Sequence, residues 1–240
     1  MRFQILPIRT TGAAENMATD FLLLQRFPEP ADARFRHYGW RGPAWTFGYS
    51  QKIAWVRAEL PADFPGELCR RPTGGGIVDH RDDWTYALAI PRGHPLEELR
   101  ATQSYRAVHE CLATALRAQQ IDAVTKPCEP AAPADAVGIQ PAGVCFHRAE
   151  IFDVVHAITG EKIAGAAQKR TKNGLLFQGS VRKPAAGPAT DWDAFGEEFV
   201  RQLAVALGAE AAPAPWPDFN EDEVSALIDH YSAPEWRELR

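Results

Sequence analysis

Apolar positions recur at three- and four-residue steps in several parts of the chain. The pattern is clearest between Ala14 and Phe27, where Met17, Phe21 and Leu24 fall on one face. This spacing predicts an amphipathic helix that Pro28 ends. The same period predicts further helices in four later segments, which are residues 50–60, 96–121, 191–207 and 221–230.

Strand-like alternation predicts β structure between these helices. The strand candidates are residues 2–8, 33–38, 44–48, 68–71 and 77–90, together with a meander over 143–181. The strands at 33–38 and 44–48 are expected to pair as a hairpin. Segments rich in proline and alanine at 124–137, 184–188 and 211–217 predict loops or linkers. This order predicts a mixed α+β fold of mostly antiparallel sheets flanked by helices. We expect a catalytic domain over 1–210 and a short helical tail over 211–240.

Composition narrows the choice of partners and compartment. The 240 residues carry a formal net charge of −5, so nothing in the overall charge favours a nucleic-acid partner. No apolar run is long enough to span a bilayer, which predicts no membrane partner. Proline at position 7 interrupts the N-terminal segment too early for a signal peptide, so we expect a cytoplasmic protein.

The four cysteines are Cys69, Cys111, Cys128 and Cys145. None belongs to a CxxC pair and no histidine pair accompanies them, so we expect no structural metal site. Four cysteines are too few for a disulfide scaffold in a chain of this length. We expect free thiols, and Cys111 falls near an apolar helical stripe, where it would serve as core packing.

The segment Arg70–His80 contains three consecutive glycines, Gly74, Gly75 and Gly76, after two arginines and Thr73. Glycines allow unusual φ/ψ angles and a close approach of another group to the backbone. Exposed N–H groups in such a turn form concavities that bind anions. The segment has neither Walker A nor GxGxxG spacing. It therefore predicts either a wall for an anionic or carbonyl-bearing ligand, or a tight hairpin turn that binds nothing.

Lys162 precedes a strand of small residues, Ile163 to Ala167. Small side chains leave volume beside a strand, enough for an acyl chain or another backbone. A lysine at the mouth of that volume would hold a carboxylate, a phosphate or a polarised carbonyl. The alternative is an ordinary turn lysine after Gly160.

Cys145 lies outside the apolar helical stripes, beside Phe146 and His147. A thiolate is a good nucleophile when a cation lowers its pKa, and His147 would point to the same side of an extended segment. The alternative is a buried structural cysteine. His80, after the glycine turn, either positions a ligand or has a structural role.

Together these stretches resemble the lipoate–protein ligase and octanoyltransferase superfamily. Residues 70–80 resemble its RR-x-[ST]-GGG-x-V-x-H segment, and residues 153–168 resemble its D-[LIV]-x…G-x-K-[IV]-x-G-[SA]-A-Q segment. Leu176–Ser180 is similar to its [LH]-[QH]-H-G-[ST] strand, and Asn16–Asp20 to its N-terminal helix opening. Two departures are Gln178, where the family often has histidine, and Arg81–Trp84, which replaces a Gly-Asn-containing sequence.

The resemblance implies a class II synthetase or biotin–lipoate ligase-like core in which the glycine turn and the Lys162 strand face one slot for a lipoyl or octanoyl chain. The site it implies has Cys145 and Lys162 as catalytic residues. The substrate-binding residues would be Arg71, Thr73, Gly74, Gly75, Gly76, His80, Gly165, Ala166 and Gly179. No metal ligand is expected among them.

The resemblance is compatible with two reactions, a transferase reaction and a ligase reaction. A transferase uses a cysteine thioester and needs no cofactor, and Cys145-Phe146 matches the C-F segment of one transferase branch. Its donor would be an acyl carrier protein and its acceptor a lysine on a lipoyl domain or glycine-cleavage H protein. A ligase would instead require ATP and Mg²⁺ and dispense with Cys145. A non-catalytic binder of acyl groups or lipoyl domains is the third possibility.

Overall fold

The computed structural model describes residues 1–27, 31–61, 63–127 and 149–239. Its helices are α1 (Ala13–Gln25), α2 (Ile53–Glu59), α3 (Pro95–Glu98), α4 (Ala101–Ala118), α5 (Lys183–Ala186), α6 (Trp192–Leu207), α7 (Glu221–Ser232) and α8 (Pro234–Arg237). Its strands are β1 (Arg2–Ile5), β2 (Arg9–Thr11), β3 (Ala33–Trp40), β4 (Ala44–Phe47), β5 (Glu67–Arg70), β6 (Ile77–Asp79), β7 (Asp83–Pro91), β8 (Ala123–Thr125), β9 (Val154–His156), β10 (Lys162–Thr171), β11 (Gly174–Arg182) and β12 (Glu210–Pro213).

Nine of the described strands form the main sheet, in the order β12-β1-β3-β7-β11-β10-β9-β8, with β2 paired to β3. From β3 to β8 along this order all pairs are antiparallel, whereas β1 pairs in parallel with both β12 and β3. A second sheet has the order β5-β4-β6. The mixed, mostly antiparallel α+β architecture predicted from the order of elements is thus confirmed.

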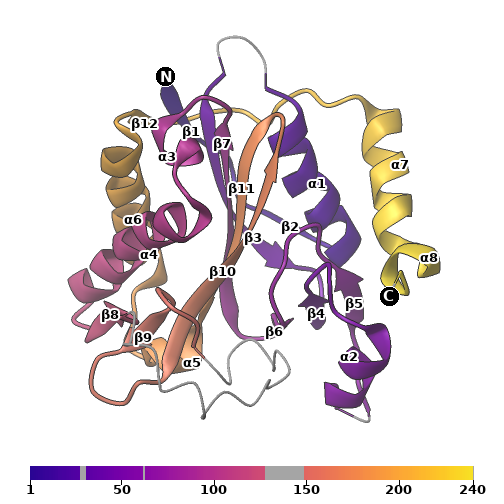
Figure 1. Ribbon diagram of the computed structural model, residues 1–240, viewed down its shortest axis with the longest axis horizontal. Helices are drawn as coiled ribbons and strands as arrows, with labels where there is room; N and C mark the ends of the chain where they lie inside the picture. The colour runs from indigo at the N-terminus through magenta and orange to yellow at the C-terminus, as the bar shows by residue number, and fades with distance from the viewer. Residues whose placement is uncertain (28–30, 62, 128–148, 240) are drawn as a thin grey trace.

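Helices cover both faces of the main sheet (Figure 1). On one face, α4 and α6 bury the largest apolar cluster, in which the rings of Phe35, Trp84, Tyr86 and Phe199 pack within about 6 Å of one another. On the other face lies α1, which buries Leu23 and Leu24 against β7 and β11. Burial of such side chains contributes about 1.5–3 kcal/mol each, and this holds α1 against the sheet.

The small sheet lies beside α1 and carries the glycine turn between β5 and β6. The helix α7 packs on the outer side of α1 and forms the right-hand edge of the view in Figure 1. Asn220 caps α7 by accepting a hydrogen bond from the Glu223 backbone N–H at 3.0 Å. Because β12 joins the main sheet, residues 210–213 connect this tail to β1. The domain boundary at residue 210 stays a prediction.

Several predicted elements were wrong. The segments at 33–38 and 44–48 do not form a hairpin, because β3 pairs in the main sheet and β4 in the small one. The expected linker at 211–217 begins as β12, and the linker at 184–188 begins as α5. The helix expected over 96–121 is broken between α3 and α4. Backbone pairing with a distant strand, which local composition does not encode, accounts for β12.

No helix in the described ranges is long and apolar enough to cross a membrane.

Candidate functional site

The glycine turn is shaped by Arg71. Its guanidinium donates to the backbone carbonyls of Gly74 and Gly76 at 2.8 and 2.9 Å, and to the Thr46 hydroxyl at 2.7 Å. Gly75 has a φ of +91°, a conformation that side chains rarely tolerate. The unusual backbone predicted for the glycine triplet is therefore present, and Arg71 fixes it from within.

The turn forms one wall of a narrow slot with a cavity volume of about 30 Å³. The slot is lined by Met17, Tyr38, Trp40, Thr46, Arg71, Gly75, Val78, His80, Thr85, Gly165, Ala166, Ala167, Gln178, Gly179 and Ser180. Six predicted binding residues are among these, including Gly165 and Ala166 of β10. The glycine turn and the small-residue strand thus face one cavity.

Lys162 lies at the start of β10 in a buried ion pair. Its Nζ is 2.7 Å from a carboxylate oxygen of Asp153, and both side chains are almost fully buried. Tyr105 of α4 donates to the other Asp153 oxygen at 2.5 Å and accepts from the Ala166 backbone N–H at 3.0 Å. A Cβ at Gly165 would lie 2.8 Å from Nζ, so the lysine lies against the backbone of the slot wall. A buried cation at this position would stabilise negative charge on a nearby ligand.

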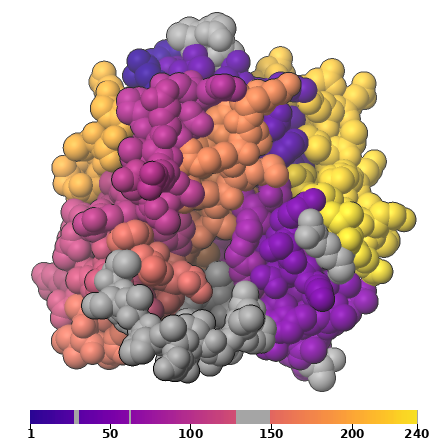
Figure 2. Space-filling view, viewed as in Figure 1, coloured from indigo at the N-terminus to yellow at the C-terminus, as the bar shows by residue number. Residues whose placement is uncertain are grey.

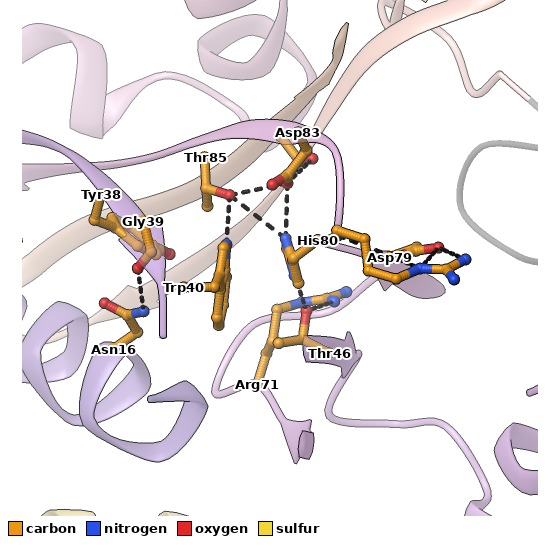
Figure 3. A network of polar contacts seen from close by, with 12 residues as sticks. Asn16, Tyr38, Gly39, Trp40, Thr46, Arg71, Asp79, His80, Asp83 and Thr85 are labelled. Carbon is orange, nitrogen blue, oxygen red and sulfur yellow. Dashed lines mark hydrogen bonds and ion pairs between the residues drawn. The ribbon is translucent and has the colours of Figure 1, made fainter. Parts of the chain in front are cut away.

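His80 belongs to a polar network at the slot (Figure 3). Its Nδ1 lies 2.7 Å from Asp83 Oδ2, and its Nε2 lies 2.7 Å from the Thr46 hydroxyl. With Nδ1–H donating to Asp83, Nε2 can accept from the Thr46 hydroxyl, which itself accepts from Arg71. The Trp40 ring stacks on His80 with centroids 4.0 Å apart. His80 is thereby held by side chains from β3, β4 and β7.

Ser180 and Thr85 complete this network. Their hydroxyls donate to Asp83 Oδ2 at 2.5 and 2.8 Å, while the Thr85 hydroxyl accepts from the Trp40 indole N–H at 2.9 Å. These side chains are thus bonded to one another through Asp83 Oδ2, whereas Asp83 Oδ1 is buried with no partner among the described residues.

A second buried network joins α1 to the glycine turn. Arg36 donates to Asp20 at 2.6 Å, and Asp20 accepts from the Gln178 amide at 2.7 Å. Gln178 in turn accepts from the Thr73 hydroxyl at 2.7 Å. Burial raises the pKa of the Asp20 carboxyl, and Arg36 and Gln178 oppose that shift. Gln178 bonds both to a carboxylate and to a hydroxyl, which requires one donor and one acceptor.

The structure separates the two arginines that precede the glycines. Arg71 lines the slot, whereas Arg70 is buried beside α8 and donates to backbone carbonyls there. Treating the pair as one basic feature of the ligand wall was therefore wrong for Arg70.

Several residues of the slot were not predicted. Tyr38 and Trp40 of β3, and Ser180 of β11, line the cavity but were not singled out. Arg34, Arg36 and Tyr38 share one face of β3, and all three are buried in the structure. Alternating polar residues along a strand ordinarily indicate a face exposed to water, so the sequence carried no signal that this face lies inside the protein.

The cysteines divide into two groups. Cys69 and Cys111 are free and buried, and burial raises the pKa of their thiols to about 12 and about 11. Cys111 packs in the largest apolar cluster, as predicted. Cys145 and His147 lie outside the described residues, so the nucleophile stays a prediction.

The site defines a class of protein: an α+β domain whose glycine turn faces a small-residue strand across a slot, with a buried lysine packed against that strand at Gly165. Residues 12–182 match the family described as the lipoyl protein ligase A/B catalytic domain. The chain belongs to this family, which confirms the resemblance seen in the sequence.

Curated relatives include octanoyltransferases named LipM. That of Halalkalibacterium halodurans is 31% identical over 70% of this chain and 61% of its own length. That of Kyrpidia tusciae is 27% identical over 94% of each chain. The chain spans about three fifths of the length of the first of these relatives.

Solved structures agree on the fold. The bipartite lipoate protein ligase of Thermoplasma acidophilum superimposes with a TM-score of 0.72 at 19% identity, over 100% of this chain and 98% of that one. A lipoate-protein ligase A bound with ATP gives 0.75 at 19% identity, over 99% of each. At this identity the likeness establishes the lipoate ligase-like fold predicted from the sequence.

Proposed function

We propose that the chain is an acyltransferase of protein lipoylation. It moves an octanoyl or lipoyl group from a carrier-protein thioester to a lysine of a lipoyl domain or glycine-cleavage H protein. The observation that carries the proposal is the slot itself, a narrow cavity between the glycine turn and Gly165–Ala167 with Lys162 packed against Gly165. The polar side chains of the wall bond to one another, which is compatible with an apolar acyl chain, and the slot of about 30 Å³ must widen to admit one.

The reaction runs in two balanced steps through Cys145. The thiolate attacks the donor thioester carbonyl, a new C–S bond forms, and the carrier thiol leaves with the proton that Cys145 gave up. The acceptor amine then attacks the acyl-cysteine, an amide forms, and an amine proton returns to the Cys145 sulfur. Lys162 supplies positive charge for the developing oxyanion in each step.

The names of the relatives support this choice of reaction, since those similar over most of this chain are octanoyltransferases. The Thermoplasma acidophilum ligase is described together with an E2 lipoyl domain, which supports a lipoyl domain as acceptor. The transferase reaction needs no cofactor. The ligase alternative, which requires ATP and Mg²⁺, is an outcome of the test.

The test is the intact mass of the purified protein after incubation with octanoyl-carrier protein without ATP. We expect an octanoyl adduct that Cys145→Ala abolishes and the matched variant Cys111→Ala retains, because Cys111 is a buried core thiol. Acyl transfer that needs lipoate, ATP and Mg²⁺, and survives Cys145→Ala, would make the chain a ligase. Binding of octanoyl groups without turnover from either donor would make it a binder.

A further inference from the structure

The guanidinium of Arg70 is enclosed by backbone carbonyls from two distant parts of the chain. Its Nη1 donates to the carbonyls of Tyr49 and Gln51 at 2.6 and 2.8 Å. Its Nε and Nη2 donate to the carbonyls of Trp236 and Arg237 at 3.0 and 2.8 Å. Arg70 is fully buried, so these carbonyls replace water around a charged group. The residues 49–51 and the helix α8 are therefore linked through one side chain.

The segment 48–51 in turn supports the glycine turn. A Cβ at Gly48 would lie 2.1 Å from the carbonyl oxygen of Gly75, so the two backbones are in direct contact. The Tyr49 N–H donates to the Thr73 carbonyl at 2.8 Å, and the Gln51 side chain donates to the Gly75 carbonyl at 3.0 Å. A displacement of this segment would therefore displace the turn.

Trp236 completes the connection from the other side. Its indole N–H donates to the Arg70 carbonyl at 2.9 Å, one residue before Arg71, which shapes the turn. Its ring packs beside Tyr49 and Tyr231, with centroids 5.7 and 5.6 Å apart. In Figure 2 the yellow C-terminal residues lie directly against the purple part of the chain that includes α2 and β5.

We propose that α8 positions the glycine turn, with Trp236 and Arg70 as positioning residues. The C-terminal tail then forms part of the ligand-binding apparatus, although it lies outside the matched family segment of residues 12–182. This inference rests on the proposed function at one point, which is that the glycine turn binds the acyl donor.

The first test is hydrogen exchange of the full-length protein, followed by mass spectrometry of peptides. Trp236→Phe keeps an aromatic ring and removes the N–H that bonds to Arg70. We expect about tenfold faster exchange in peptides covering residues 71–77, because one hydrogen bond contributes about a factor of ten to local stability. The matched control is Trp216→Phe, which removes an indole bond to the Pro7 carbonyl elsewhere in the tail. It should leave these peptides unchanged.

Arg70→Lys provides a second variant, which keeps the charge but cannot donate to all four carbonyls. Its control is Arg34→Lys, a buried arginine that bonds to the Leu23 carbonyl instead. Unchanged exchange at residues 71–77 in both Trp236→Phe and Arg70→Lys would overturn the proposal, whatever the activity. So would an equal rise across all peptides, which would mean general destabilisation.

Kinetics distinguish this inference from the proposed function. If both hold, Trp236→Phe should raise KM for octanoyl-carrier protein about tenfold with a smaller change in kcat. Faster exchange of the turn in a protein that transfers no acyl group would support the positioning role and refute the transferase. A lower kcat at unchanged KM would overturn the link between α8 and donor binding.

Discussion

Tyr105 donates its phenol proton to Asp153, the same carboxylate that pairs with Lys162. The phenol oxygen also accepts from the Ala166 N–H on the slot wall, so one hydroxyl connects the ion pair to β10. The Lys162 side chain is thus oriented by a group on α4, an element that does not line the slot. This relationship gives the first prediction.

Tyr105→Phe should lower octanoyl transfer at least tenfold and reduce the free energy of unfolding by about 2 kcal/mol. The cost arises because Asp153 loses a donor and the Ala166 N–H loses its acceptor in a buried site. The matched control is Tyr86→Phe, because the Tyr86 hydroxyl is buried with no partner among the described residues. Urea unfolding and transfer rates measure both effects, and equal behaviour of the two variants would contradict the role of Tyr105.

Gln178 should be replaceable by histidine but not by leucine. A histidine ring has one nitrogen that can donate to Asp20 and one that can accept from Thr73. A leucine can do neither, so the Asp20 carboxylate and the Thr73 hydroxyl would each lose a buried hydrogen bond. We expect Gln178→Leu to cost about 1–3 kcal/mol of unfolding free energy. Gln178→His should retain most of the stability and activity. Loss of both stability and activity in Gln178→His would show that the exact positions of the amide atoms matter, and not only the presence of one donor and one acceptor.

Gly165→Ala should impair transfer in a protein that still folds. The new Cβ would meet Cε and Nζ of Lys162 at 2.8 Å and force the flexible end of that side chain to move. We expect a loss of at least tenfold in transfer rate and about 1–3 kcal/mol in unfolding free energy, because the buried Lys162–Asp153 pair must shift. The control Gly42→Ala adds its Cβ to open space. Wild-type transfer by Gly165→Ala would mean that the position of Lys162 is unimportant.

The pH dependence of stability should reflect His109. Burial lowers the pKa of His109 to about 4 from the ordinary 6.5, against the opposing effects of Asp153 and the Phe152 carbonyl. Between these values the unfolded chain binds a proton that the folded protein does not. Stability from this source is therefore complete above pH 6.5 and is lost as the pH falls towards 4, by up to about 1.4 kcal/mol per unit.

Urea unfolding between pH 7 and pH 4.5 measures this effect. His109→Asn removes the titrating ring and can still donate to the Phe152 carbonyl, so its stability should fall less steeply with acid. A slope equal to that of the wild type would assign the acid sensitivity to other groups.

The parts of the fold that local patterns encode were predicted well. The long helices α1 and α6 lie within two residues of their expected limits, because apolar spacing specifies the buried face directly. The turn and its facing strand were also predicted, since glycines and small residues leave a distinct local signature. The hairpin assigned to β3 and β4 was wrong because sequence neighbours in this fold belong to different sheets.

Residues that act through distant partners were not predictable. Nothing near Tyr105 in the sequence indicates that its hydroxyl meets Asp153, 48 positions away. Trp236 likewise bonds to Arg70 across 166 positions. Such contacts depend on how complete elements pack, and a pattern within one segment carries no information about them.

The strand β12 has a consequence for how the protein is made. It pairs in parallel with β1 on the side that β3 does not cover, so β1 is an edge strand until residues 210–213 join the sheet. During synthesis the edge of β1 therefore stays uncovered until nearly the whole described chain has been made. The carbonyls of α8 that bond to Arg70 are synthesised later still. An exposed strand edge is prone to pair with other chains. We therefore expect chaperones to bind nascent chains that have not yet reached residue 210, because these chains expose the free edge of β1.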